Sequence, residues 1–226
     1  MEDLLVETKH EGLTHKGKRT RENIVNVAKD LFYHNGYNNT GIQDIAEKAE
    51  VKLGTMTYYF KKKNNLVSEI YNTYFMELYN DVAELLGKEA TLFAKYCYTL
   101  VLLYNSILED SGNARFYYEI MAKNVNRKEL LYLTKTFNRS CLDFFNKTYD
   151  EYELNAFTIG NFGAQKKIFM DYYEHEIFYP KGEILRYLVT NAFKMIAIDR
   201  DTIDNTYDQA LVFLENWTGK DIRFLV

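Results

Sequence analysis

Apolar residues recur at intervals of three and four along most of the chain, the spacing that places them on one face of a helix. Between residues 20 and 35 this pattern predicts a first helix, which Gly36 should end because glycine adopts the left-handed conformation without steric cost. Its predicted buried stripe is Ile24, Val27, Ala28, Leu31 and Phe32. A single proline, Pro180, and eleven glycines interrupt the 226 residues. So few helix breakers favour an all-α protein.

Residues 40–63 read as two short helices joined by a tight turn at Glu50–Lys52. Thr40 is the predicted start of the first, because its hydroxyl can accept the amide N–H of Gln43 while the Gln43 side chain reaches back to Thr40. A small, hydroxyl-bearing outward face on the second helix suits insertion into a major groove about 12 Å wide. The predicted inward residues are Met56, Tyr59 and Phe60, and the outward ones are Gly54, Thr55, Thr57 and Tyr58.

A long stripe from Asn64 to Leu86 predicts a helix of roughly 35 Å at 1.5 Å per residue, long enough to connect two parts of the molecule. Its apolar positions are Leu66, Ile70, Tyr74, Leu78, Val82 and Leu85. Further helices are predicted at Glu89–Glu109, Asn113–Lys123, Arg127–Tyr149 and Ala164–Tyr179, with Glu151–Gly163 as the least regular link. Two amphipathic helices follow Pro180, with a turn at Asp199–Asp201 between them.

The net charge of −4 is unevenly distributed. Residues 16–63 carry ten basic and five acidic side chains, a net charge of +5, whereas residues 64–226 have a net charge of −6. A basic segment on an acidic body indicates one surface for a polyanion and another for a different ligand. The cluster Lys16, Lys18, Arg19 and Arg21 has two interpretations, a solvated helix start or an arm along a phosphate backbone, and charge alone favours the first.

Several classes of protein lack support. Cys97 and Cys141 are too few for a disulfide framework and have no zinc-ligand partners at motif spacing. We expect a cytoplasmic protein with no membrane contact, because no apolar run reaches the roughly 20 residues of a membrane span and no signal-peptide core is present. A metal could bind within the run Asp171, Glu174, His175 and Glu176, but a solvated acidic face is the simpler interpretation. No nucleophile, phosphate-loop or paired-histidine motif indicates an enzyme, and no cofactor is expected.

The order and spacing of residues 24–66 resemble the DNA-binding domain of the TetR family of bacterial transcriptional regulators. The matching residues are Ile24, Ala28, Leu31, Phe32, Gly36, Tyr37, Thr40, Asp44, Ile45, Ala46, Val51, Gly54, Thr55, Tyr58, Tyr59, Phe60, Lys61, Lys63 and Leu66. Three positions depart from the family pattern: Glu50 replaces a turn glycine, Lys52 replaces a capping serine or threonine, and Thr57 replaces a frequent aromatic residue. Glu50 should therefore adopt an unfavourable backbone conformation.

The resemblance implies which residues contact DNA. Base-facing positions are Gln43, Leu53, Gly54 and Thr57. Positions beside phosphates are Thr40, Gly41, Thr55, Tyr58, Tyr59 and Lys63, and Lys52 and Lys61 complete the candidate set. Gly41 could contribute only its backbone N–H. Gln43 could pair bidentately with adenine or serve in the helix cap, and both interpretations are open.

The resemblance also implies an architecture. Residues 1–63 would form an N-terminal arm and a three-helix helix-turn-helix domain, and residues 64–226 a helical ligand-binding and dimerisation domain, with nine to ten helices in all. Candidate residues for the pocket of an unidentified small-molecule effector are Tyr96, Tyr104, Phe116, Tyr118, Phe137, Cys141 and Phe144, any of which could instead belong to the core. Candidate residues for a homodimer interface are Leu185, Leu188, Val189, Ala192, Ile196, Tyr207, Leu211 and Leu214.

The function that this resemblance implies is a repressor that binds a pseudo-palindromic operator in double-stranded DNA and responds to an effector. A dimer would place two DNA-binding heads in successive major grooves about 34 Å apart. The alternative is a TetR-like fold that has lost specific DNA binding and serves as a protein-interaction module, and Glu50 and Lys52 are its only support. An enzyme is the least supported class.

Overall fold

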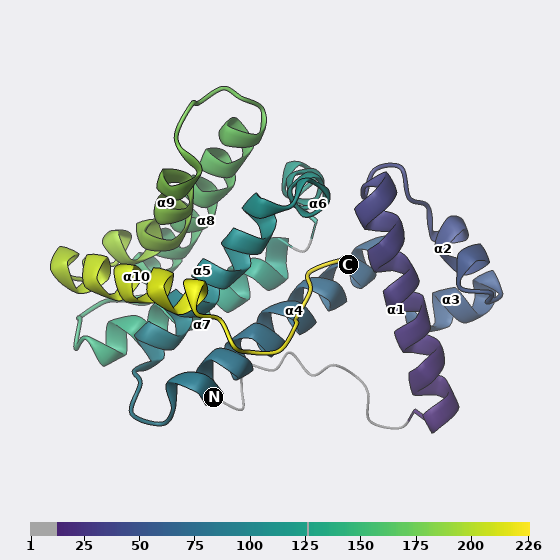
Figure 1. Ribbon diagram of the computed structural model, residues 1–226, viewed down its shortest axis with the longest axis horizontal. Helices are drawn as coiled ribbons and strands as arrows, with labels where there is room; N and C mark the ends of the chain where they lie inside the picture. Colours follow the sequence, from purple (N-terminus) through teal and green to yellow (C-terminus); the bar gives the residue numbers. More distant parts are fainter. Residues whose placement is uncertain (1–12, 126) are drawn as a thin grey trace.

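The computed structural model describes residues 13–125 and 127–226, and this part of the chain contains ten α-helices and no strand (Figure 1). The all-α prediction is confirmed. The helices are α1 (His15–Asn35), α2 (Ile42–Lys48), α3 (Leu53–Tyr59), α4 (Lys63–Leu86), α5 (Leu92–Glu109), α6 (Ser111–Ala122), α7 (Arg127–Phe144), α8 (Glu151–Tyr173), α9 (Lys181–Met195) and α10 (Arg200–Glu215). The predicted lead-in over residues 1–12 lies outside the described residues.

Helices α1, α2 and α3 form the head, with α1 between the two short helices and the rest of the molecule (Figure 1). The predicted stripe on α1 is confirmed, since Ile24, Ala28 and Phe32 are fully buried. Ile45 of α2 and Met56 of α3 are fully buried as well and complete the core of the head. α1 begins at His15, five residues before the predicted start, because the Thr14 hydroxyl accepts the Gly17 N–H at 3.2 Å and caps the helix.

Helix α4 connects the head to the body. Its first turns carry Leu66 and Ile70 against the head, and its later turns bury Tyr74, Leu78 and Val82 in the body. The predicted stripe is therefore confirmed except for Leu85, which is 44% exposed. Since one continuous helix takes part in both cores, a displacement of its body end also displaces its head end.

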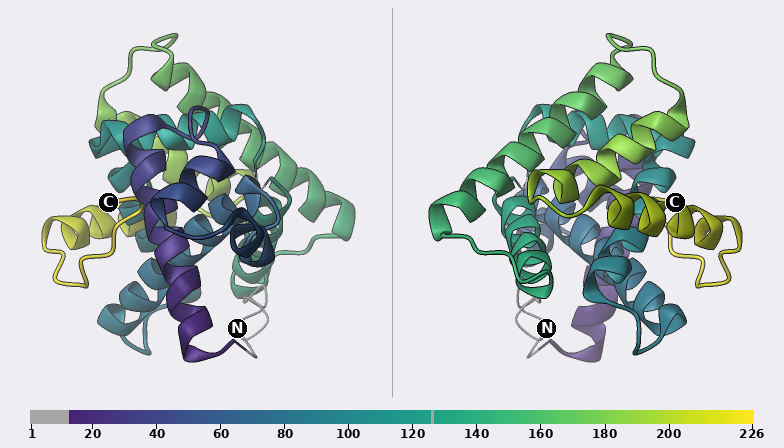
Figure 2. Two further views of the ribbon diagram at one scale, coloured as in Figure 1. Left: turned by 90° about the vertical axis from the view of Figure 1, so that its right-hand side faces the viewer. Right: turned by 90° about the vertical axis from the view of Figure 1, so that its left-hand side faces the viewer.

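The body is built around α5, eleven of whose 18 residues are buried. α5 contacts α4, α6, α7, α9 and α10, so it is the central helix of the bundle. α8, α9 and α10 cover the side of the body away from the head (Figure 2). Among the described residues, no helix combines the length and the apolar character needed to cross a membrane.

The main correction to the predicted elements concerns α8. Residues 151–163, predicted as an irregular link, are the first half of a 23-residue helix. The Asp150 carboxylate accepts the Glu153 N–H at 2.8 Å, and the Glu153 carboxylate accepts the Asp150 N–H at 3.0 Å, so a capping box begins the helix early. α7 correspondingly ends at Phe144 rather than Tyr149.

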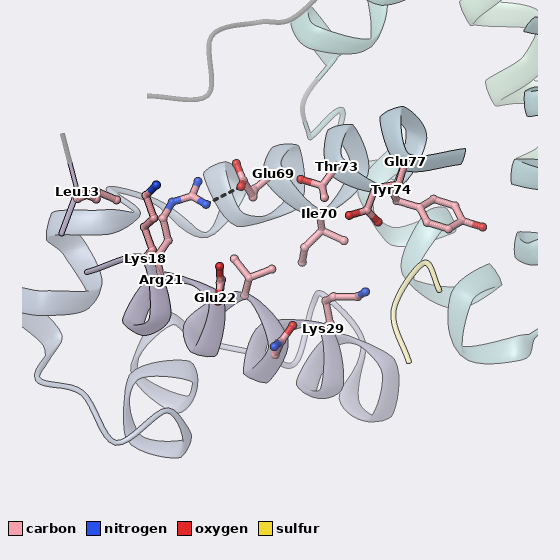
Figure 3. A pocket seen from close by; sticks show the side chains of 12 residues that line it. Leu13, Lys18, Arg21, Glu22, Lys29, Glu69, Ile70, Thr73, Tyr74 and Glu77 are labelled. Atoms are coloured by element: carbon pink, nitrogen blue, oxygen red, sulfur yellow. Dashed lines mark hydrogen bonds and ion pairs between the residues drawn. The ribbon is translucent and has the colours of Figure 1, made fainter. Parts of the chain in front are cut away.

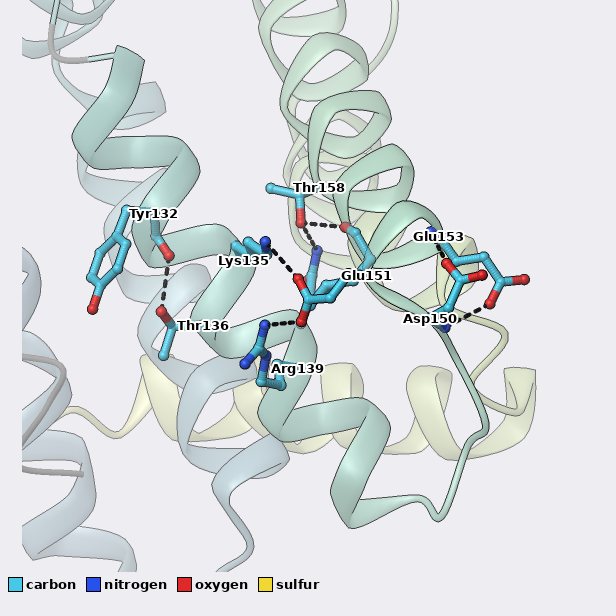
Figure 4. A network of polar contacts seen from close by, with 10 residues as sticks. Tyr132, Lys135, Thr136, Arg139, Asp150, Glu151, Glu153 and Thr158 are labelled. Carbon is cyan, nitrogen blue, oxygen red and sulfur yellow. Dashed lines mark hydrogen bonds and ion pairs between the residues drawn. The ribbon is translucent and has the colours of Figure 1, made fainter.

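The corner between α7 and α8 is held by ion pairs (Figure 4). Glu151 contacts Lys135 at 3.0 Å and also contacts Arg139, so one carboxylate on α8 joins two positions on α7. These side chains are partly or largely exposed, so water screens the attraction within each pair. They orient the corner more than they stabilise the body.

Five helices end on residues other than glycine with positive φ. The residues are Glu50, Asn124, Asn146, His175 and Ala197, with φ between 51° and 61°. In each case the next residue donates its N–H to a carbonyl five positions back, as Val51 does to Ala46 at 3.0 Å. This is the Schellman arrangement, which glycine usually completes. The unfavourable conformation predicted at Glu50 is confirmed.

Candidate nucleic-acid interface and ligand cavity

One side of α3 is free of contacts with the rest of the head. Leu53 is 44% exposed and Tyr58 is 73% exposed, and Gly54 and Thr57 are exposed between them. The opposite side carries Met56, which is fully buried. The exposed side has little bulk apart from Tyr58 at its edge, so α3 can approach a groove closely.

Thr55 and Tyr59 lie at the boundary between the two sides of α3. Thr55 is half-buried. Tyr59 is also half-buried, its hydroxyl lies against Gly17, and its ring meets Tyr58 edge to face at 5.0 Å. The inward prediction for Tyr59 is therefore correct only in part, and its position beside exposed Tyr58 fits a residue at the rim of an interface.

The predicted cap at Thr40 is wrong. α2 begins at Ile42, and the Gly41 N–H donates to the Asp44 carboxylate at 2.7 Å. The Thr40 hydroxyl is turned inward, is 1% exposed and donates to the Gly36 carbonyl at 2.7 Å. It therefore cannot reach a phosphate. The side chain of Gln43 does not take part in the cap and is exposed.

The Gly41 N–H is likewise engaged, and the Asp44 carboxylate occupies the beginning of α2. A phosphate there would have to compete with a negative charge that is already bound. Lys63 is also used within the chain. Its Nζ donates to the carbonyls of Tyr37 at 2.6 Å and Thr40 at 2.7 Å and lies 3.9 Å from the centre of the Tyr37 ring. Burial lowers the pKa of Lys63 from its usual value. Lys63 thus joins α4 to the α1–α2 loop.

Lys52 and Lys61 remain exposed at the two ends of α3. Lys52 precedes the first helical residue, and its side chain makes no capping hydrogen bond. The turn is nevertheless formed, since both α2 and α3 are intact around Glu50 and Lys52. These two residues therefore do not distort the two-helix unit.

The head is fastened to α6 of the body. The Tyr33 hydroxyl donates to Asp110 at 2.9 Å, and the Asn38 N–H donates to Glu119 at 2.7 Å. The Tyr33 ring fills the space beside Gly112, where an added Cβ would lie 2.5 Å from the ring. A side chain at this position would push α1 away from α6.

The body contains a cavity of about 40 Å³ between α4, α5, α6, α7 and α8. Its twelve described lining residues are Tyr71, Phe75, Tyr96, Leu100, Tyr104, Tyr117, Leu130, Leu133, Thr134, Phe137, Phe162 and Gln165, and none of these carries a charge. Tyr96 and Phe137 stack with centroids 3.9 Å apart and form a flat wall. Thr134, Phe162 and Gln165 are half-buried and form the outer wall.

The phenols of the cavity are neutral hydrogen-bonding groups. Burial raises the pKa of Tyr104 to about 12, and it raises the pKa values of Tyr71, Tyr96 and Tyr117 well above the usual value. Tyr104 and Tyr117 are hydrogen-bonded to each other. Asn161, one turn before Gln165 on α8, is 1% exposed, and neither polar atom of its side chain has a partner within the described residues. The interior near the cavity therefore holds unused hydrogen-bonding capacity.

Comparison with known proteins identifies this arrangement. A sequence profile described as "Bacterial regulatory proteins, tetR family" matches residues 24–70, from α1 through the exposed side of α3 into α4. Residues 24–70 belong to the TetR family.

Individual relatives agree with this assignment. The HTH-type transcriptional regulator QacR of Staphylococcus aureus (strain Mu50 / ATCC 700699) is 28% identical over 145 residues, which cover 64% of this chain and 72% of QacR. The uncharacterized HTH-type transcriptional regulator YuxN of Bacillus subtilis (strain 168) is 29% identical over 92 residues, 41% of this chain and 32% of YuxN. The alignment thus spans about a third of the length of YuxN. The crystal structure of RolR in complex with resorcinol has the same fold, with a TM-score of 0.60, 18% identity, and coverage of 86% of this chain and 95% of RolR.

The residues expected to line a pocket divide into two groups. Tyr96, Tyr104 and Phe137 line the cavity. The others do not: Phe116 stacks on Phe32 of α1, Tyr118 contacts Glu174, Cys141 is buried, and Phe144 is 47% exposed. Tyr71 and Tyr117 were missed, although Tyr71 lies one position after the predicted stripe residue Ile70.

The residues expected to form a dimer interface lie mostly in the core of the single chain. Leu185, Leu188, Val189, Ala192, Ile196 and Tyr207 are at most 6% exposed, and Leu211 and Leu214 are half-buried. They face inward because α9 packs on α5 and α8, and α10 packs on α5. A partner subunit could not reach the six buried residues without opening the body. Within the described residues, no cluster of acidic, histidine or cysteine side chains is arranged to hold a metal ion.

Proposed function

We propose that this TetR-family chain is a homodimeric repressor whose affinity for operator DNA changes when a small uncharged molecule enters the body cavity. The observation that carries the proposal is the exposed side of α3, which is narrow and flanked by Lys52 and Lys61. A dimer with two such heads in successive major grooves would obstruct RNA polymerase on that stretch of DNA.

Contacts with base edges and contacts with phosphates would be made by different residues. Gln43, Leu53 and Thr57 are exposed and would read base edges, with the Gln43 amide suited to adenine. Lys52, Lys61 and the Tyr58 hydroxyl would contact phosphates. The basic cluster on the first turns of α1 would add phosphate contacts that do not depend on sequence.

The dimer contact would involve α8. The apolar residues of this helix are spread around its circumference and are not confined to one stripe. Yet Tyr152 is 86% exposed and Ile159 is 54% exposed, and Ala156 and Gly163 continue the same outward stripe. A second copy of the chain that packs on this stripe would bury it and leave the cores of α9 and α10 undisturbed.

The effector would be a small ring that carries hydrogen-bonding groups and no charge. An ion entering the cavity would lose its hydration and find only neutral phenol, hydroxyl and amide groups there. RolR, which has the same fold, was crystallised with resorcinol, an uncharged phenol. A cavity that holds one benzene has a volume of about 150 Å³. The present cavity of about 40 Å³ must therefore expand to admit a ring.

Expansion of the cavity supplies the coupling to DNA. A ligand shifts a conformational equilibrium only if it binds two states with different affinity. A ring that fits only the expanded cavity meets this condition. The Tyr71 side chain lines the cavity, and Tyr71 lies on α4. The same helix carries Leu66 at its head end, so a shift of Tyr71 would be passed along α4 to the head.

Fluorescence anisotropy with the DNA upstream of the chain's own gene would test the proposal. The expected result is salt-sensitive, saturable binding to one segment, with weaker binding to shuffled DNA. Thr57→Ala should change the ratio of affinities between related sites, because Thr57 is exposed on α3 and would face the bases. No preference for any segment, with or without small molecules, would instead favour the protein-interaction module.

Thermal unfolding with matched rings would test the class of effector. Phenol and resorcinol should raise the melting temperature, and Tyr104→Phe should reduce the increase. Benzoate and benzylammonium present the same ring with a negative or a positive charge and should have no effect. Equal stabilisation by the charged rings would contradict the proposed class.

A further inference from the structure

Residues 217–226, which we call the strap, follow α10 and return to the head. They form no helix or strand and run along α4 until they reach the region between α1 and α6 (Figure 1). The strap thereby touches a part of the molecule far from α10. None of the roles proposed above uses it.

The strap is first anchored at Asp81 on α4. The Asp81 carboxylate is 5% exposed, accepts the Lys220 backbone N–H at 2.7 Å and lies 3.3 Å from the Lys220 ammonium. Gly219 makes the turn just before this contact. A Cβ added to Gly219 would lie 2.2 Å from the Trp217 ring and 2.4 Å from the Asp81 carboxylate. The turn therefore has no room for a side chain at residue 219.

The second anchor is the Phe224 ring, which is 1% exposed. Its centroid lies 5.0 Å from Tyr74 and 6.2 Å from Tyr71, both on α4, and 5.5 Å from Phe116 on α6. Leu225 is 3% exposed and extends the same contact. An aromatic side chain buried among rings from two helices is a substantial anchor, since such rings dominate contact energies.

The strap also reaches the head. Lys29 of α1 donates from its ammonium to the Arg223 carbonyl at 2.9 Å. Phe116, which contacts Phe224, stacks on Phe32 of α1 with centroids 5.2 Å apart. Lys29 and Tyr74 lie at one end of the groove between α1 and α4, where the strap passes (Figure 3). The strap is thus in contact with α1, α4 and α6.

We propose that the strap is an intramolecular peptide ligand that holds the head against the body and links its position to the body cavity. Phe224 rests on Tyr71, a wall of the cavity, and on Phe116, which supports Phe32 of the head. A change that displaces Tyr71 removes one of the aromatic rings against which Phe224 packs. The strap then loosens, and α1 is no longer held by the Lys29 hydrogen bond or supported by Phe116.

Pulsed electron paramagnetic resonance would test the holding role in the full chain, without DNA or effector. Spin labels at Lys52→Cys and Lys128→Cys would report the distance between the head and α7. Cys97 and Cys141 are buried, and burial raises the pKa of the Cys141 thiol to about 12, so neither should be labelled. An excess of unlabelled protein would keep the labelled pairs within one chain.

The expected result is one narrow distance in the parent and in Val226→Ala, which alters an exposed strap residue. Phe224→Ala and Gly219→Ala should each broaden or displace that distance, because they release the two anchors independently. Circular dichroism would confirm that the helices persist. Identical distances in all four proteins would overturn the holding role.

Hydrogen exchange would test the link to the cavity. Tyr71→Ala removes the wall that touches Phe224, whereas Leu130→Ala removes a wall on α7 for which no contact with the strap is described. The amides of Lys220, which donates to Asp81 at 2.7 Å, and of Ile222, which donates to the Lys220 carbonyl at 2.9 Å, should lose protection in Tyr71→Ala and keep it in Leu130→Ala. If both variants or neither changed these amides, the link would be refuted. Since the measurement uses no DNA, its failure would leave the proposed repressor function intact.

Discussion

Two glycines of the head differ in whether a Cβ could be added to them without strain. Gly36 ends α1 with φ +82°, and a Cβ there would lie 2.8 Å from the Glu119 carboxylate. Gly54 is exposed within α3, and no heavy atom beyond its chain neighbours and the nearby backbone of α3 lies within 4 Å of the position of its missing Cβ. The same substitution at the two positions therefore separates backbone constraint from helix propensity.

Gly36→Ala should lower the free energy of unfolding by about 1–2 kcal/mol or more, because alanine is strained at this φ and Glu119 would have to release the Asn38 N–H. Gly54→Ala should raise the same free energy by about 0.5–1 kcal/mol, since alanine favours the helix. Urea unfolding of both variants would measure these changes. Equal effects of the same sign would contradict the role given to Gly36.

Tyr104 should make stability depend on alkaline pH. The folded protein keeps the Tyr104 proton up to its pKa of about 12, whereas the unfolded chain releases it near 10. The contribution of Tyr104 is therefore complete below pH 10 and is lost as the pH rises towards 12, up to about 3 kcal/mol. Tyr104→Phe should reduce the fall of unfolding free energy over that interval, as followed by urea unfolding at each pH. An unchanged slope would show that Tyr104 ionises equally in both states.

For single residues, the sequence predicted which side chains are buried better than it predicted which partners they contact. The spacing of Met56 and Phe60 determined which side of α3 is buried, and the structure agrees. The cap of α2 was misassigned because Thr40 and Asp44 are both good partners for a helix start, and the Thr40 hydroxyl instead donates to the Gly36 carbonyl four residues earlier. The residue pattern did not show which of these two nearby partners the Thr40 hydroxyl would take.

Among the elements, α8 shows how the proposed dimer would affect the interpretation of a single chain. Its apolar residues point in all directions, so the three-to-four periodicity that identified the other helices is absent from its first half. The spread of apolar residues around α8 is explained if one side of the helix packs on the body and the other side packs on a second copy of the chain. The stripes of α9 and α10 were regular, and this regularity reflects their packing within one chain.

Ile159→Glu should weaken the dimer by more than tenfold, because it would bury a carboxylate in an apolar contact. Ile159 is 54% exposed in the single chain, so the subunit itself should fold normally. Val212→Glu is the matched control, since Val212 is 59% exposed on α10. Sedimentation at several concentrations would measure both. Dissociation by Val212→Glu alone would place the interface on α10.

In the whole molecule, the charges are divided between a basic head and an acidic body. Residues 16–63 have a net charge of +5 and residues 64–226 a net charge of −6. This division favours approach to DNA head first and repels the body from it. The head charge is not all available, because Lys63 is bound to two carbonyls and Arg21 is paired with Glu69 at 2.6 Å.

Lys61→Ala should weaken binding to every DNA sequence and lower the slope of log affinity against log salt by about one for each phosphate that is no longer neutralised. Lys61 is exposed next to α3, so its removal should leave the fold unchanged. Lys128→Ala removes a similarly exposed lysine from α7 and should not alter the slope. Anisotropy titrations at several salt concentrations would compare them. The same slope for both variants would exclude Lys61 from the phosphate contacts.

The fastening of the head to α6 also limits how such a protein can be rearranged in evolution or by engineering. A head from another regulator could be exchanged for this one only if it supplied the Tyr33 ring beside Gly112 and an amide at the position of Asn38 for Glu119. Chimeras joined at the start of α4 would lack these partners and would leave a buried carboxylate unpaired. Replacement of the head should therefore succeed only when α6 is replaced with it. The part of the molecule that can be exchanged as a unit then consists of two segments that are separated in the sequence.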